Sequence, residues 1–157
     1  MTQPAEPMNL GLLLFLPYRF MESAVMAELK AHGHDLPLSH ARVFQRIDPA
    51  GSRMNHLAEA AQISKQTLTS IIDQLEGRGY VRRTPSPRDA RVRLVTITDR
   101  GRGLIDLSQP VVAAVEATWT SYLGQARAAQ LRDILTDLAD LTDPCENYTD
   151  LTQDGTT

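Results

Sequence analysis

One short segment in the middle of the chain carries polar side chains that could form hydrogen bonds with the edges of DNA bases. Its apolar residues recur at the spacing of one helix face: Leu68, Ile71, Ile72 and Leu75. Ser64 precedes this pattern and is a favourable helix N-cap. The opposite face is almost uncharged, and hydroxyl, amide and ammonium groups at its N-terminal end are suited to contacts in the major groove. The candidate DNA-contacting residues on this face are Ser64, Lys65, Gln66, Thr67, Thr69 and Ser70.

A second group of candidate residues lies in the basic segment that follows. Residues 85–89 are rich in proline and predict a turn. Arg88 at its tip could enter a narrow, electronegative minor groove. Asp89 and Arg91 are two residues apart and could form an ion pair that stiffens the loop, although such a surface pair contributes only about 0–1 kcal/mol. Further arginines flank the turn: Arg82, Arg83 and Arg93.

The elements around these residues predict a winged helix-turn-helix. A short apolar helical pattern begins at Met54, with Asn55 as its expected N-cap, and only Gln62 and Ile63 separate it from the polar helix. Two strand-like runs follow, at residues 80–84 and 91–98, and form a hairpin. We therefore expect a mainly α fold with a small β-hairpin, in which residues 49–98 form the winged helix-turn-helix.

Longer helical patterns flank this unit on both sides. They cover residues 9–31 and 39–47 before it, and about 98–123 and 126–141 after it. Pro17 and Pro110 fall inside two of them and predict a kink or a break. We expect one domain over residues 1–157, with residues 143–157 as an acidic tail.

Composition and charge narrow the class of protein. The chain has 157 residues and a net charge of −3, yet residues 53–103 hold ten of its sixteen basic residues, which suggests a segment that faces a polyanion. Its single cysteine excludes an internal disulfide. The longest apolar run, residues 10–18, is shorter than the roughly 18 residues that span a membrane, and no charged leader precedes it. We expect a soluble cytoplasmic protein without a membrane partner.

Residues 39–104 strongly resemble the multiple-antibiotic-resistance regulator (MarR) family of bacterial transcription factors. The residues that carry the resemblance are Leu57-Ala58-Glu59, Ser64-Lys65-Gln66-Thr67-Leu68-Thr69, Leu75-Glu76-Gly77-Arg78-Gly79-Tyr80-Val81, Asp89-Ala90-Arg91, Val95-Thr96-Ile97-Thr98 and Gly101. The resemblance implies a homodimer joined by the helices of residues 1–48 and 99–142. It also implies small ligands, often aromatic acids or phenols, that bind between these helices and the winged helix and weaken DNA binding.

The sequence departs from the family pattern at three positions. Gln62 stands where a turn glycine is usual. Ser70 stands where an arginine is frequent, and Ala90 follows Asp89 where an arginine is common. Two outcomes are open at the tip of the wing: Arg88 replaces the missing contact, or the contact with DNA is weaker there.

Candidate sensor residues are drawn from several elements. A ligand pocket between the first two helices and the long fifth helix would be lined by Phe15, Tyr18, Arg19, His40, Phe44 and Trp119, although such aromatic residues also commonly form the core. A zinc site would draw on His32, His34, Asp35 and His40. Cys145 is a candidate redox sensor, but the adjacent acidic residues should raise its pKa and disfavour the thiolate. The preferred interpretation assigns no metal and no cofactor.

The function predicted from the sequence is therefore DNA binding, not catalysis. No serine–histidine–aspartate group, phosphate-binding loop or paired-carboxylate motif indicates an enzyme. We expect a dimeric repressor that binds a pseudo-palindromic operator in double-stranded DNA, with half-sites about 10 base pairs apart, and that a small ligand releases. The alternatives are a winged-helix module that binds protein, and a metal- or redox-sensing regulator.

Overall fold

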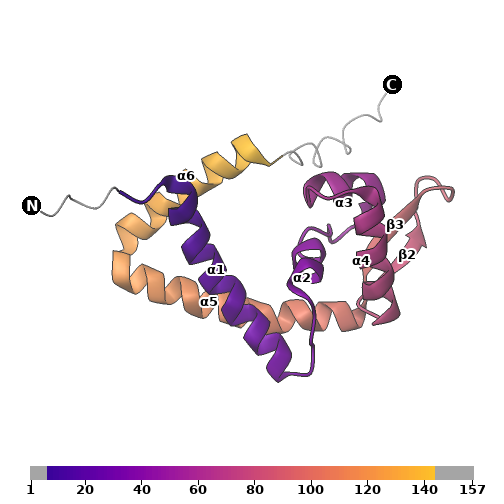
Figure 1. The fold of residues 1–157 in the computed structure, drawn as a ribbon, viewed down its shortest axis with the longest axis horizontal. Coiled ribbons are helices and arrows are strands. Elements are labelled where there is room, and N and C mark those ends of the chain that lie inside the picture. The colour runs from indigo at the N-terminus through magenta and orange to yellow at the C-terminus, as the bar shows by residue number, and fades with distance from the viewer. Residues whose placement is uncertain (1–6, 144–157) are drawn as a thin grey trace, which may run out of the picture.

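The computed structural model describes residues 7–143, which form six helices and a three-stranded sheet (Figure 1). In chain order the elements are α1 (Leu10–Ala31), α2 (Leu38–Phe44), β1 (Ser52–Arg53), α3 (Met54–Ala60), α4 (Lys65–Gly77), β2 (Val81–Pro85), β3 (Arg93–Ile97), α5 (Asp99–Leu123) and α6 (Gln125–Thr142). The strands are antiparallel in the order β1-β3-β2. The predicted mainly α fold with a winged helix-turn-helix is confirmed.

The core of the winged helix lies where α3 and α4 meet the sheet. Six apolar side chains there are less than 2% exposed: Leu57, Leu68, Ile72, Leu75, Val81 and Val95. Burying each of them contributes about 1.5–3 kcal/mol. The apolar face predicted for α4 is therefore the face that attaches the helix to the rest of the domain, and its polar face is left outside.

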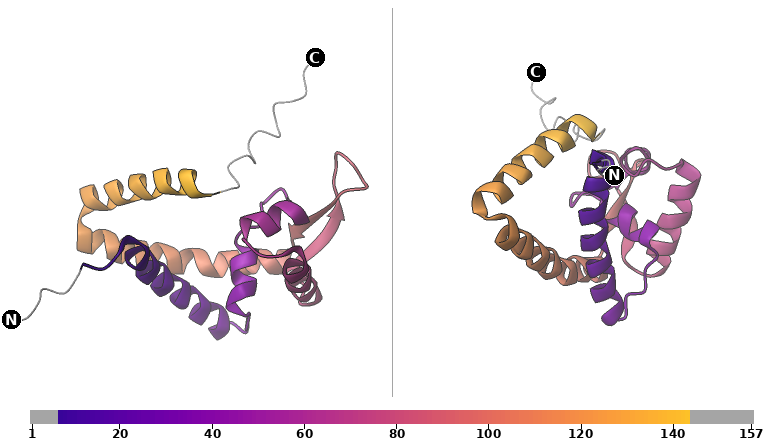
Figure 2. Two further views of the ribbon diagram at one scale, coloured as in Figure 1. Left: turned by 45° about the horizontal axis from the view of Figure 1, so that its top comes forward. Right: turned by 60° about the vertical axis from the view of Figure 1, so that its left-hand side comes forward.

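The flanking helices form an extended second part of the molecule. Helix α5 runs from the sheet to the far end, where Gly124 adopts a φ of 81° and the chain turns back into α6 (Figure 2). Helix α1 packs against α5, and α6 also packs against α5. Among the residues of α6, all of which are described, no side chain is buried.

The N-caps expected from the sequence are partly correct. The Ser64 hydroxyl accepts from the Thr67 N–H at 3.1 Å, and Ser64 is the N-cap of α4 as predicted. The prediction that Asn55 caps α3 is wrong, because β1 leads directly into the helix and places Arg53 at the cap. The sheet also gains β1, a strand too short to stand out in the sequence.

Helix α1 differs from expectation in two ways. It continues through Pro17 to Ala31 without a break. Among the described helices it is the one that is long and apolar enough to cross a membrane by length and composition. The sequence prediction counted only the longest uninterrupted apolar run, residues 10–18, whereas the apolar positions of α1 extend beyond Pro17. In this structure α1 packs against α5 and forms an ion pair with α2, so it is a helix of the folded domain.

Candidate nucleic-acid interface and ligand cavity

The turn before α4 sets the angle between α3 and α4. Gln62 has a φ of 52°, the one positive value among the described residues other than glycine. Glycine adopts this left-handed conformation without steric cost, so the turn suits the glycine of the family pattern. The Ile63 N–H donates to the Ala58 carbonyl at 3.1 Å across the turn. Gln62 therefore holds a backbone conformation that is strained for a residue with a side chain.

The polar face of α4 is exposed as the sequence indicates. All six candidate residues are exposed, from Ser64 to Ser70. The Thr69 hydroxyl donates to the Lys65 carbonyl at 2.8 Å, so its methyl group and its oxygen lone pairs face outward. Within residues 7–143 no hydrogen bond occupies the side-chain amide of Gln66. That amide can therefore donate and accept at once, as bidentate recognition of adenine requires.

Arg83 of β2 attaches the polar helix to the wing. Its guanidinium donates to Asp73 of α4 at 2.6 Å and also pairs with Glu76, and its backbone N–H donates to Glu76 at 2.8 Å. Burial alone would lower the pKa of Arg83, but the two carboxylates outweigh it and raise the pKa. The sequence analysis counted Arg83 only as part of a basic hairpin and missed this role.

The tip of the wing contains the predicted ion pair. Arg91 donates to both carboxylate oxygens of Asp89, at 3.1 Å from Nε and 3.3 Å from Nη2. Its backbone N–H also donates to Asp89 at 3.0 Å. These bonds lower the pKa of Asp89, the side-chain pair first and the backbone bond second. Arg88 is exposed beside them, so α4 and the wing bring all nine candidate DNA residues to one end of the molecule (Figure 1).

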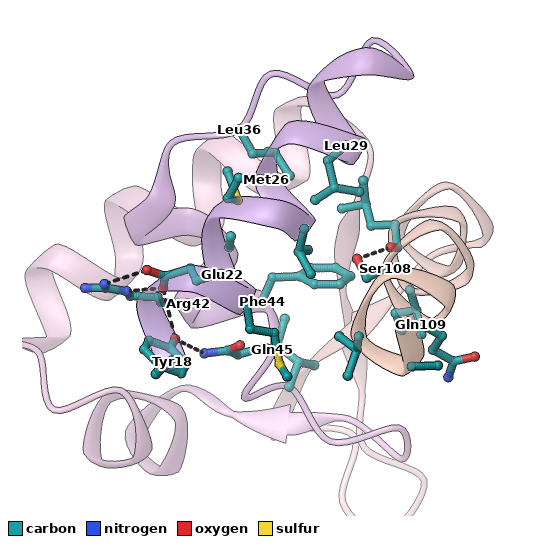
Figure 3. A pocket seen from close by; sticks show the side chains of 18 of the residues that line it. Tyr18, Glu22, Met26, Leu29, Leu36, Arg42, Phe44, Gln45, Ser108 and Gln109 are labelled. Atoms are coloured by element: carbon teal, nitrogen blue, oxygen red, sulfur yellow. Dashed lines mark hydrogen bonds and ion pairs between the residues drawn. The ribbon is translucent and has the colours of Figure 1, made fainter. Parts of the chain in front are cut away.

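A cavity of about 510 Å³ lies between α1, α2 and α5 (Figure 3). This volume is in the range of sites that hold drug-sized ligands. Its walls are mostly apolar, and Leu29, Val25 and Leu104 are among them. Of the residues predicted to line a pocket here, Tyr18 and Phe44 do so.

The other four predicted pocket residues lie elsewhere. Phe15 is 44% exposed, and the guanidinium of Arg19 lies 5.7 Å from its ring centroid on the surface of α1. His40 is buried against α4, where its Nε2 is 3.2 Å from the Gln74 side-chain oxygen. Trp119 lines a separate groove of about 320 Å³ between α5 and α6. Helical spacing alone does not show which face of α1 or α5 meets α2, so it could not exclude these residues.

One end of the cavity carries a polar cluster that the sequence analysis did not identify (Figure 3). Glu22 accepts from Arg42 Nε at 2.7 Å and from Arg42 Nη2 at 3.0 Å. Tyr18 donates its hydroxyl to Glu22 at 2.9 Å and accepts from Gln45 at 3.4 Å. The bond from Arg42, which outweighs burial and is assisted by Tyr18, lowers the pKa of Glu22, so Glu22 is ionised at neutral pH.

The candidate metal ligands do not converge in the described part of the chain. His34 lies 2.9 Å from the Tyr80 hydroxyl, His32 contacts Glu28, and His40 contacts Ser39 and Gln74. Within residues 7–143 no group of three histidine, cysteine or acidic side chains could hold a metal ion. Cys145 lies outside the described residues.

Comparison with known proteins shows which family the chain resembles. Residues 34–92 match the model described as "MarR family". CouR from Rhodococcus jostii RHA1, solved bound to p-coumaroyl-CoA, superposes with a TM-score of 0.64 at 26% identity, over 83% of this chain and 92% of CouR. The winged helix-turn-helix of the chain therefore resembles that of MarR-family transcriptional regulators. A structure of CouR bound to a 23-mer DNA duplex is similar to the same extent, with 25% identity and a TM-score of 0.63.

The curated relatives include both a transcriptional activator and a transcriptional repressor. The transcriptional activatory protein BadR of Rhodopseudomonas palustris is 40% identical over 65 residues. That match covers 41% of this chain and 37% of BadR, well under two thirds of its length. The repressor Rv2887 of Mycobacterium tuberculosis is 28% identical over 85% of this chain and 96% of its own length.

Proposed function

We propose that this protein is a homodimeric, sequence-specific DNA-binding repressor that a small aromatic ligand releases. The observation that carries the proposal is the exposed, nearly uncharged polar face of α4, which Arg83 holds against an arginine-rich wing. A surface helix without a partner usually carries many charges, whereas base recognition needs amides and hydroxyls. The relatives named above are regulators, which supports a binding protein and not an enzyme.

Each candidate side chain has a role in the proposed complex. Gln66 reads an adenine, while Thr67, Thr69 and Ser70 contact neighbouring base edges or phosphates, and Lys65 pairs with a phosphate or a guanine. The N-terminus of α4, capped by Ser64, faces the DNA backbone. Arg88 enters the minor groove, and the Asp89–Arg91 pair keeps the loop in the shape that presents it.

A second copy of this chain is the proposed partner of the exposed apolar helices. On α1, Leu13, Leu14 and Phe20 are 48–61% exposed, and on α6 Ile134 and Leu138 are 49% and 41% exposed. Apolar surface of this extent is typical of an interaction site. Residues 1–48 and 99–142 thus form the proposed dimerisation region, and the two-fold axis sets two α4 helices about one DNA turn apart.

The cavity supplies the proposed route to release. It lies between α1 and α5, which belong to the dimerisation region, and α2, which packs on α4. A ligand that fits the cavity better in one arrangement of the two parts shifts the population toward that arrangement, and the spacing of the two α4 helices changes. The p-coumaroyl-CoA bound to CouR supports an aromatic ligand class.

Selection from a random-sequence DNA pool tests the proposal. The purified protein is first shown to be folded by its melting curve and dimeric by light scattering. We expect enrichment of an inverted repeat whose half-sites are about 10 base pairs apart. A folded dimer that enriches no sequence would contradict the proposal and favour the alternative winged-helix module that binds protein. Enrichment of a single half-site by a monomer would contradict the dimer.

Transcription from a promoter that contains the selected repeat tests the direction of regulation. The protein should lower transcript yield in a reconstituted cytoplasmic extract by occluding the promoter. An increased transcript yield would show that the protein activates transcription and does not repress it. The proposal of sequence-specific DNA binding would still stand.

A further inference from the structure

Among residues 7–143, the charged groups that line the cavity between α1, α2 and α5 are Glu22, Arg42 and Glu116. None of them is a cation without a carboxylate partner. Arg42 donates to both oxygens of Glu22 with the Nε–Nη2 edge of its guanidinium, at 2.7 and 3.0 Å, so its positive charge is matched by that carboxylate. Glu116 accepts from Arg132 at 2.9 Å, and Arg132 does not line this cavity. The lining therefore holds two carboxylates and one guanidinium that is already paired.

The uncharged polar groups of the lining mostly present acceptors. The Ser108 hydroxyl donates to the Leu104 carbonyl at 2.6 Å, so only its lone pairs remain. The Tyr18 hydroxyl already donates its hydrogen bond to Glu22, so it can only accept from a ligand. Glu22 Oε2 accepts only the bond from Arg42 and keeps capacity for another donor. The Gln109 amide can act in either direction, and the Gln45 amide keeps one N–H besides the one that it donates to Tyr18. A ligand that fits these groups brings a hydrogen-bond donor and no negative charge.

We infer that the effector of this cavity is an uncharged, largely apolar molecule that carries a hydroxyl group, and that Glu22 excludes carboxylates. The inference rests on the proposed role of the cavity as an effector site. Of the two ligand classes expected there, aromatic acids and phenols, it retains only uncharged molecules such as phenols. A hydroxyl donates to Glu22 Oε2 while the rest of the molecule lies against the apolar wall. A carboxylate in the same place brings no donor to Glu22 Oε2 and sets a second negative charge beside a carboxylate that is only 11% exposed.

A pair of ligands that differ in charge but hardly in shape tests this inference. 2-Naphthalenemethanol and 2-naphthoate share one ring system and differ by a hydroxymethyl group against a carboxylate. Titration calorimetry on the full-length protein without DNA should show the alcohol binding at least about ten-fold more tightly. Equal or tighter binding of 2-naphthoate would overturn the inference. Binding of neither compound at millimolar concentration would overturn it too, while DNA binding is judged separately by the selection experiment.

Exchange of Glu22 itself should reverse the preference. Glu22→Gln removes the negative charge and releases Arg42 as a cation, so 2-naphthoate should bind about ten-fold or more tightly than it binds the natural protein. Glu28→Gln is the matched control, because Glu28 is also on α1 but does not line the cavity. It should leave both affinities unchanged. An unchanged affinity of a folded Glu22→Gln protein for 2-naphthoate would contradict the role of Glu22. If this variant does not fold, the comparison of the two ligands on the natural protein still decides.

Discussion

Arg83 of β2, in the wing, donates to Asp73 of α4 at 2.6 Å. This bond joins the wing to the helix in addition to the short turn that connects α4 and β2. The same guanidinium pairs with Glu76 one helical turn further along α4. Helix and wing therefore present their polar groups as one rigid surface. In the proposed complex with DNA, this rigidity keeps the groove contacts of α4 in register with those of the wing.

Replacing Arg83 by alanine should weaken this surface more than it weakens the fold. We expect a loss of about 1 kcal/mol in unfolding free energy, because the pair is partly exposed and water takes over some of its hydrogen bonds. DNA affinity should fall further, since α4 and the wing no longer bind as a unit. Urea titration and fluorescence anisotropy measure the two quantities. Arg82→Ala, on the exposed side of the same strand, controls for the loss of one positive charge. Equal losses in both variants would contradict a positioning role.

Gln66 and Arg88 should affect DNA binding in different ways. Gln66→Ala should remove about 1–3 kcal/mol of discrimination at one base pair and relax the selected sequence there. Arg88→Ala should weaken binding to all sequences alike and reduce the salt slope by about one. Anisotropy titrations on the selected operator and on a variant operator at several salt concentrations separate these effects. Unchanged affinity, preference and salt slope in both variants would contradict the proposed contacts.

Gln62→Gly should stabilise the protein. A residue with a side chain pays about 1–2 kcal/mol for the left-handed conformation, and the added flexibility of glycine in the unfolded chain offsets about half of this. The expected net gain is below about 1 kcal/mol, or a few degrees in melting temperature. Gln62→Ala keeps the backbone strain and is the matched control. A gain of the same size with alanine would show that the side chain, and not the φ of 52°, is the cause.

Two glycines on α5 should respond in opposite ways to alanine. At Gly101 an added Cβ would collide with the Tyr80 carbonyl and with Ile97, where the helix crosses the strand. Gly101→Ala should destabilise the fold by about 1–3 kcal/mol or more. At Gly103, two residues along, nothing lies within 4 Å, so Gly103→Ala should stabilise the helix by up to about 1 kcal/mol. Thermal melts of both variants test the pair, and similar effects at both sites would refute the close approach.

The Glu22–Arg42 pair should make stability depend on pH in a defined direction. The pKa of Glu22 is lowered from its ordinary value of 4.5, so its contribution is complete above that value and is lost as the pH falls through the lower, folded value. The difference in unfolding free energy between the natural protein and Glu22→Gln should be largest at neutral pH and shrink in acid. Tyr18→Phe removes one hydrogen-bond donor to Glu22. Its difference in unfolding free energy from the natural protein should be smaller, and it should also shrink in acid. A gap that is constant from neutral pH to acid would contradict this assignment.

The sequence by itself determined the features that depend on near neighbours. Ser64 caps α4 through a residue three positions away, and Asp89 pairs with Arg91 across two, so local spacing was enough to predict both. The apolar period of α4 likewise showed which of its faces would be exposed.

Contacts between distant segments were decided only by the tertiary structure. Glu22 meets Arg42 because the fold brings α1 and α2 to the same cavity. The packing of α2 on α4 places His40 against Gln74 and not in the cavity. Arg83 reaches Asp73 only because β2 folds back along the helix. Helical spacing states which residues share a face but not which neighbour that face meets, since that choice depends on how all the apolar surfaces are buried together.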